Sequence, residues 1–160
     1  MKRLSRGLLL LMLAGALIAC GPPRKSVFPP DVTIQQLVVS ANGQWQLTLR
    51  IQNNSYGEMQ FTALDGSLQI ADQLPVRLHT TFKRDIPALS GDVIALQVLP
   101  TATMTKALQA VAAKGSAGSL PYRIGGSATA KPEQERKPRD FAFNGTDWLS
   151  PVPGIAHTYR

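Results

Sequence analysis

Apolar and polar residues alternate strictly between Trp45 and Gln52, and no other pattern in the chain constrains the fold as much. Tryptophan, leucine and isoleucine occupy every second position, with glutamine, threonine and arginine between them. Because successive side chains of a β-strand point to opposite faces, this period of two predicts a strand with one buried and one solvated face. Such strands are typical of antiparallel sheets. The expected buried residues are Trp45, Leu47, Leu49 and Ile51.

Further strand signals predict an all-β sandwich or barrel. The predicted strands cover residues 32–39, 45–52, 59–63, 68–70, 76–82, 92–99, 119–130 and 141–143. We expect a hairpin turn at Asp65-Gly66, with Met59 and Phe61 on the core side of the strand before it. The segment 92–99 is apolar at both parities, which predicts a central strand. Gly125-Gly126 predict a bulge or a close approach of two backbones.

One stretch has the periodicity of a helix. Apolar residues recur there at helical spacing, a threonine at position 101 or 103 is suited to cap the first turn, and Gly115 follows the last turn. The stripe consists of Met104, Ala107, Leu108 and Val111. We predict a single short helix that packs this stripe against the core.

The N-terminus is organised like a bacterial export signal. Residues 1–7 are basic, and residues 8–18 are apolar without interruption. The apolar run is about half of the ~20 residues that span a bilayer, so a signal peptide over residues 1–19 is favoured over a permanent span. Leu17-Ile18-Ala19-Cys20 resembles the lipobox of bacterial lipoproteins, which implies that Cys20 is lipidated and becomes the first mature residue. The alternative is an ordinary cleavage site that releases a soluble protein.

The lipid anchor agrees with the cysteine content, because the chain has one cysteine. An exported protein with one free thiol would otherwise carry a reactive group without a partner. The lipoprotein resemblance also implies, through Gly21 in place of aspartate after Cys20, sorting to the outer membrane of a Gram-negative cell, facing the periplasm. Prolines at 22, 23, 29 and 30 predict an extended tether over residues 20–31 that lets the domain stand off the membrane.

Charge and motifs argue against nucleic-acid binding and catalysis. Of the 17 Lys+Arg, three precede position 20, which leaves 14 against 10 Asp+Glu and a net charge of about +4, too small for a nucleic-acid binder. No nucleotide-binding, serine-hydrolase or zinc-protease motif occurs, so we expect no cofactor, no metal and no enzyme activity. His79 is predicted to lie on a strand surface. The basic pairs Lys83-Arg84 and Arg136-Lys137 are predicted to be solvated, with anionic lipid headgroups as the alternative contact.

Residues 146–160 are predicted to form a C-terminal tail, because Pro151 and Pro153 disfavour regular sheet pairing. Two interpretations are open. Trp148 and Leu149 cap an open end of the sandwich, or Trp148, Leu149, Pro151 and Pro153 form a docking strip for a partner. An aromatic side chain beside a rigid, donor-poor segment binds at a low cost in ordering.

Several motifs resemble the late-embryogenesis-abundant type 2 family, also called water-stress and hypersensitive-response domains. They lie at residues 49–54, 65–68, 86–87 and 121–126, and the resemblance covers residues 32–145. The chain departs from the family at Asn54, where a proline is common. The resemblance implies an immunoglobulin- or fibronectin type III-like antiparallel β-sandwich with one short α-helix. It also implies binding or protection rather than catalysis.

Two non-catalytic functions therefore remain open. The first is a membrane-anchored binding module that faces the periplasm, with an envelope protein or lipid as its partner and a role in the envelope stress response. The second is a structural protein that protects against desiccation. Single surface substitutions would impair the first function and leave the second unchanged.

Overall fold

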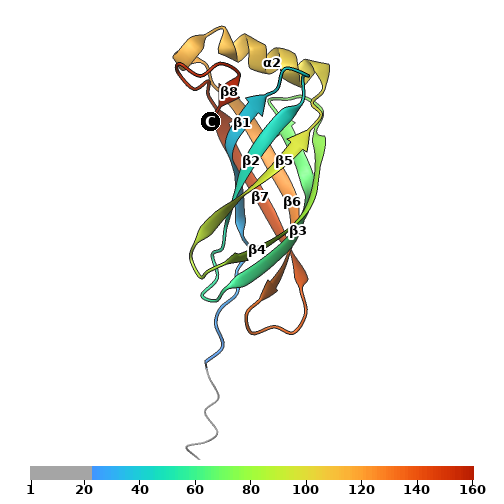
Figure 1. Cartoon of the computed structure of the whole chain (residues 1–160), viewed down its shortest axis with the longest axis vertical. Helices are drawn as coiled ribbons and strands as arrows, with labels where there is room; N and C mark the ends of the chain where they lie inside the picture. The colour runs from blue at the N-terminus through green and yellow to red at the C-terminus, as the bar shows by residue number, and fades with distance from the viewer. Residues whose placement is uncertain (1–22) are drawn as a thin grey trace, which may run out of the picture.

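Eight strands and one α-helix make up a β-sandwich in the computed structural model, which describes residues 23–160 (Figure 1). The strands are β1 (Asp31–Val39), β2 (Trp45–Gln52), β3 (Met59–Ile70), β4 (Val76–Ile86), β5 (Gly91–Val98), β6 (Leu120–Pro132), β7 (Arg139–Leu149) and β8 (Thr158–Tyr159). The helix α2 (Ala102–Ala112) follows β5, and a 3₁₀ turn covers Gly115–Ala117. Cys20 and the predicted signal peptide lie outside the described residues.

The strands form two antiparallel sheets of four, with the orders β5-β2-β1-β8 and β4-β3-β6-β7. Strands β1, β2 and β5 thus share one sheet, and β3, β4, β6 and β7 form the other, which is a fibronectin type III-like arrangement. Within residues 23–160, the predicted fold class, an all-β sandwich with one short helix, is confirmed. No helix within residues 23–160 is both long and apolar enough to cross a membrane.

The core lies between the two sheets and contains the face predicted from the alternation. Trp45, Leu47, Leu49 and Ile51 are at most 1% exposed. Met59 and Phe61 are fully buried in the opposite sheet. Burial of the alternating face removes its apolar area from water, which is the main force that holds the two sheets together.

The hairpin turn predicted at Asp65-Gly66 is wrong, because β3 continues through both residues. Gly66 lies opposite Gly126 of β6, and a Cβ atom on either glycine would overlap the facing backbone. The pair thus allows the close backbone approach that was predicted for Gly125-Gly126. The irregularity in register lies elsewhere in β3, between Phe61 and Ala63.

The central position predicted for the segment 92–99 is also wrong. Strand β5 is at the edge of its sheet and pairs along its length with β2. Ile94, Leu96 and Val98 face the core, while Val93 is 40% exposed on the outer face. The outward positions of this edge strand carry apolar residues, so composition alone suggested burial on both faces.

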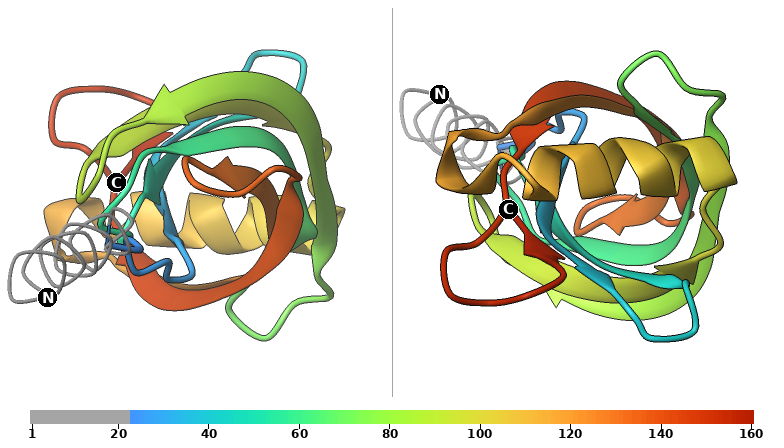
Figure 2. Two further views of the ribbon diagram at one scale, coloured as in Figure 1. Left: turned by 90° about the horizontal axis from the view of Figure 1, so that it is seen from below. Right: turned by 90° about the horizontal axis from the view of Figure 1, so that it is seen from above.

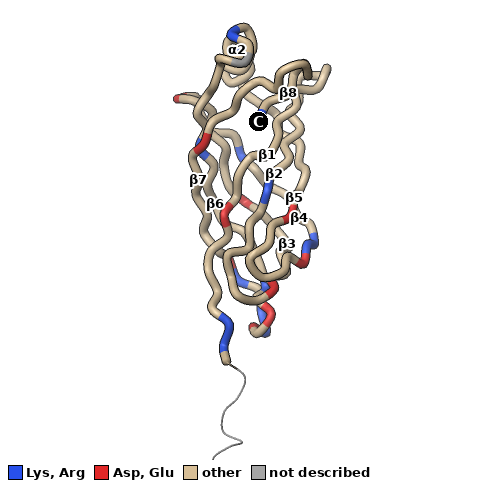
Figure 3. Tube along the Cα trace, turned by 90° about the vertical axis from the view of Figure 1, so that its left-hand side faces the viewer, with Lys and Arg blue, Asp and Glu red and all other residues tan. Residues whose placement is uncertain are grey.

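The sandwich has two different ends, and the helix closes one of them. Thr101 caps α2 by accepting a hydrogen bond from Met104 N at 3.2 Å, as predicted. Met104, Leu108 and Val111 are buried, and α2 crosses this helical end (Figure 2). The other end, called the N-terminal end, carries residues 23–30 and the loops 53–58, 87–90 and 133–138 (Figure 1). Charged residues of both signs are interspersed and gather at its loops (Figure 3).

Candidate functional site

The segment predicted to be a C-terminal tail is part of the sandwich. Strand β7 extends to Leu149, and β8 returns to pair with Leu37 and Val38 of β1. The chain between them folds as a hairpin, with hydrogen bonds from Val152 N to Thr158 O (2.9 Å) and from Arg160 N to Ser150 O (2.9 Å). The donors on this arm are Ser150 and Val152, so Pro151 and Pro153 fall at positions that need no N–H. The prolines therefore do not prevent pairing.

The structure separates the four residues predicted as a docking strip. Leu149 is fully buried in the core and has no surface to offer a partner. Trp148 is 59% exposed on the outer face of β7, so it does not cap the sandwich. Its neighbour across the strand pair is Pro121, and its backbone N–H donates to Asp147 Oδ1 at 2.8 Å. Pro151 and Pro153 line a separate hollow, to which Trp148 does not contribute.

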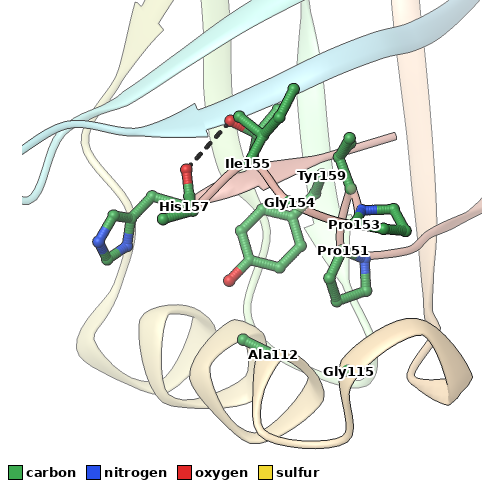
Figure 4. A pocket seen from close by; sticks show the side chains of 11 residues that line it. Ala112, Gly115, Pro151, Pro153, Gly154, Ile155, His157 and Tyr159 are labelled. Atoms are coloured by element: carbon green, nitrogen blue, oxygen red, sulfur yellow. Dashed lines mark hydrogen bonds between the residues drawn. The ribbon is translucent and has the colours of Figure 1, made fainter.

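That hollow, the C-terminal pocket, lies between the last turn of α2 and the hairpin 150–160, and its volume is about 410 Å³ (Figure 4). The lining consists of Ala112, Gly115 and the continuous segment 151–159. Ile155 on the rim is 57% exposed. The pocket therefore combines an apolar rim with a wall of peptide groups.

Local backbone geometry shapes the C-terminal pocket. Gly154 (φ +78°) and His157 (φ +60°) adopt left-handed conformations that turn the chain, and Ile155 N donates to Val152 O at 3.2 Å. His157 O accepts a hydrogen bond from Val39 N at 2.9 Å, which fastens the turn to β1. The hairpin is held on two sides and therefore forms a fixed wall.

Tyr159 joins the hairpin to the helix. Its ring points toward α2, and the hydroxyl donates to Leu108 O at 3.4 Å (Figure 4). Burial raises the pKa of the Tyr159 hydroxyl above its ordinary value, since the phenolate would lose its hydration. The side chain stays neutral at physiological pH and serves as a packing element between the two walls.

The lining of the C-terminal pocket contains few ionisable side chains. Besides Tyr159, His157 is the one ionisable side chain in the lining, and no acidic residue accompanies it. Across residues 23–160, no three His, Cys, Asp or Glu side chains come together in a way that would hold a metal ion.

A second hollow of about 300 Å³ lies beside Trp148 on the outer face of β6 and β7. Arg123 and Asp147 contribute charge there, and Thr146 also lines the hollow. The hollow is more polar than the C-terminal pocket, and Trp148 is its apolar wall.

His79 lies on a strand surface, as predicted. Its Nδ1 is 2.8 Å from Asp65 Oδ2, and the same oxygen accepts a hydrogen bond from Arg77 Nη2 at 2.7 Å. The hydrogen bond from Arg77 is the main cause that holds the pKa of the Asp65 carboxyl below its ordinary value, and the hydrogen bond with His79 is the next largest. All three side chains are exposed, so this is a surface ion cluster.

Comparisons with known proteins give structural neighbours and no family. No family model matches the chain, and no curated protein matches it. A crystal structure of a protein from Archaeoglobus fulgidus is similar with a TM-score of 0.41 and 8% identity, covering 79% of this chain and 100% of that one. A solution structure of a protein from Arabidopsis thaliana has a TM-score of 0.47 and 8% identity, covering 87% and 88%. The X-ray structure of a structural genomics target has a TM-score of 0.45 and 13% identity, covering 81% and 91%.

Sequence reasoning missed the residues that complete the C-terminal pocket, namely Ile155, His157 and Tyr159. One signal was present, because the Pro153-Gly154 pair is typical of a turn and Thr158-Tyr159 beyond it has strand propensity. The contact with α2 had no local signal, since Leu108 and Tyr159 lie far apart in the chain.

Proposed function

We propose that the chain is a lipid-anchored binding module of the late-embryogenesis-abundant type 2 kind, which faces the periplasm and holds a partner in its C-terminal pocket. The observation that carries the proposal is the placement of this pocket. The described part of the chain begins at the N-terminal end, whereas α2 and the hairpin 150–160 lie at the helical end (Figure 1). The pocket is lined by the end of α2 and by residues 151–159, so it belongs to the helical end. An anchor at Cys20 would therefore direct the pocket away from the membrane.

The lining favours a protein partner with an extended, uncharged segment. Pro151, Pro153 and Ile155 supply apolar contacts, and no carboxylate or ammonium group lines the pocket. A charged segment would lose hydration there without gaining an ion pair.

The anchor is tested by Cys20→Ser in the full chain. If Cys20 carries the lipid, the variant loses acyl labelling and no longer sediments with membranes. Leu74→Ser, at an exposed position of the β3–β4 loop, leaves the cysteine intact, is the matched control and keeps both properties. A Cys20→Ser protein that still incorporates labelled fatty acid would contradict the proposed anchor.

The pocket is tested by photo-crosslinking in living cells. A benzophenone side chain at Ile155 is expected to give a discrete adduct with an envelope protein, and one at Leu74, which is exposed on another loop, is not. Ala112→Trp fills the pocket and should abolish the adduct. Ala113→Trp, one residue further along the chain and outside the lining, should leave it unchanged. Equal adducts in the two tryptophan variants would contradict binding in the pocket.

A further inference from the structure

The N-terminal end carries three exposed apolar side chains that come from separate loops. Phe28 is 45% exposed, and Tyr56 and Leu89 are each 59% exposed. They come from the segment before β1, the β2–β3 loop and the β4–β5 loop. We call these three residues the apolar tip. Apolar side chains that converge on one end are a more specific signal than the same number scattered over a surface.

A buried hydrogen-bond network fixes the apolar tip. Ser55 is fully buried, and its Oγ accepts from Phe28 N at 2.9 Å and donates to Phe28 O at 3.2 Å. The Ser55 carbonyl accepts from Leu89 N at 3.2 Å. The rings of Phe28 and Tyr56 meet edge to face, with centroids 6.1 Å apart and an interplanar angle of 74°. The three side chains are thus presented together by a rigid base.

Leu89 occupies a conformation that a leucine rarely adopts. Its φ is +55°, in the left-handed region where glycine or asparagine is favoured. More than half of the Leu89 surface is exposed, so packing within the domain does not account for a leucine at this position. A strained and exposed apolar residue points to a contact outside the domain.

The short stretch of chain between Cys20 and the sandwich limits which surface the apolar tip can contact. The chain is bound to the sandwich from Lys25 onward, where Lys25 N donates to Gln134 Oε1 at 2.9 Å and Lys25 Nζ pairs with Glu133 at 2.6 Å. Five residue steps separate Cys20 from Lys25, which is at most about 18 Å when fully extended. The tether is therefore much shorter than residues 20–31 suggested, and the domain does not stand far from an anchor at Cys20.

Cations beside the apolar tip suit a surface of phosphate headgroups. The anions of the 133–138 loop are engaged, because Glu133 pairs with Lys25 and Glu135 pairs with Arg139 at 3.0 Å. Within residues 23–160, no ion pair involves Arg136 or Lys137. These two exposed cations remain available to anionic lipid.

We propose that the apolar tip inserts into the headgroup region of the bilayer that holds the lipidated Cys20. The proposal rests on the anchor under "Proposed function". Phenylalanine, tyrosine and leucine would sit at the boundary between headgroups and acyl chains, with Arg136 and Lys137 on phosphates. Insertion at this point would fix the orientation of the sandwich, so that the helical end faces away from the membrane.

The test places a tryptophan probe in the apolar tip. Leu89→Trp is made in the full-length lipoprotein with Trp148→Phe, so that buried Trp45 is the one other indole. The protein is reconstituted in vesicles of phosphatidylethanolamine and phosphatidylglycerol, with and without brominated acyl chains. Leu74→Trp in the same background is the matched control, because Leu74 is exposed on the β3–β4 loop at the opposite end. Acylation and vesicle flotation are measured on the same samples.

Insertion shifts the emission of the Leu89→Trp protein to the blue on reconstitution, and brominated lipid quenches it, while the control changes in neither respect. An acylated, floating protein with a water-like, unquenched Leu89→Trp signal overturns the tip contact and leaves the anchor standing. Quenching of a protein that is not acylated supports the tip contact and contradicts the anchor. A protein that is neither quenched nor acylated contradicts both the tip contact and the anchor. A blue-shifted signal before vesicles are added means that a second copy or another segment of the chain covers the tip, which also overturns the proposal.

Discussion

Replacement of Asn53 by alanine should destabilise the whole N-terminal end. The Asn53 side chain is fully buried, and its Nδ2 lies 2.9 to 3.0 Å from three carbonyl oxygens, those of Gly57, Ile86 and Pro87. Its Oδ1 accepts from Ser55 N at 2.9 Å. One amide thus joins the β2–β3 loop to the end of β4, and with it the two loops that carry Tyr56 and Leu89.

The expected cost follows from the number of bonds that alanine cannot make. Two N–H groups serve three acceptors, so Asn53 makes two full donor bonds and one acceptor bond, each worth about 1 kcal/mol net. Alanine also leaves buried backbone groups without partners, at a further cost of about 1 to 2 kcal/mol. We expect Asn53→Ala to lower the free energy of unfolding by about 4 to 5 kcal/mol.

The adjacent amide supplies the control. Asn54 donates to Pro29 O at 3.1 Å and Asp31 Oδ2 at 3.0 Å, but at a site that water reaches. Asn54→Ala should therefore cost less than about 1 kcal/mol. Urea unfolding followed by the fluorescence of buried Trp45 measures both values. With an m-value of about 2 kcal/mol/M, Asn53→Ala lowers the midpoint by about 2 M. Equal midpoints for the two variants would refute the assignment of Asn53 as the central bond donor.

Three further predictions concern the core, the exposed tryptophan and the contact between the sheets. In urea unfolding, Leu49→Ala should lower the free energy of unfolding by about 2 to 5 kcal/mol, whereas Thr48→Ala should change it by no more than about 0.5 kcal/mol. Similar losses in the two variants would mean that the buried face of β2 is misassigned. Trp148→Ala should cost less than about 1 kcal/mol, because its side chain is exposed, and a large loss of thermal stability would show that Trp148 caps the sandwich after all. Ile34 N donates to Tyr122 Oη at 3.0 Å, so Tyr122→Phe should cost about 1 to 3 kcal/mol by leaving that buried N–H unpaired. Burial raises the Tyr122 pKa above its unfolded value of 10.0, so its hydroxyl stabilises the fold below that pH and the stability declines as pH rises through the folded pKa. Tyr122→Phe should flatten this alkaline decline in unfolding titrations, and an unchanged slope would assign it to another group.

Local periodicity predicted a strand or helix correctly where one face of that element is buried and the other is exposed. The alternation in β2 identified its strand limits and its buried face, because the period of side chains along a strand is a property of the chain itself. The stripe of Met104, Leu108 and Val111 identified the helix and its packing side for the same reason. The Thr101 cap depends on atoms three residues apart and was equally visible.

The candidate sites were only partly predictable, since their parts are distant in the chain. Sequence reasoning grouped Trp148, Leu149 and the two prolines, but the alternation of β7 buries Leu149 and exposes Trp148. The pocket wall opposite Pro151 and Pro153 comes from α2, and no local pattern indicates which helix a hairpin will meet. The apolar tip likewise joins three loops that become neighbours through the Ser55 network.

Short stretches of the sequence were enough to predict the strand-rich architecture, the core face of β2 and the one capped α-helix of residues 23–160. The N-terminal residues also show a pattern that resembles a lipoprotein signal. These follow from spacing and composition within short windows. Tertiary structure alone decided that β3 runs straight through Asp65-Gly66, that β5 lies at an edge and that the C-terminal hairpin pairs with β1. Each of these depends on a partner strand: Gly126 facing Gly66, β2 beside β5, and β1 beside β8. A backbone group is satisfied by whichever strand the whole fold brings alongside it, and that strand is not specified within any short stretch of the chain.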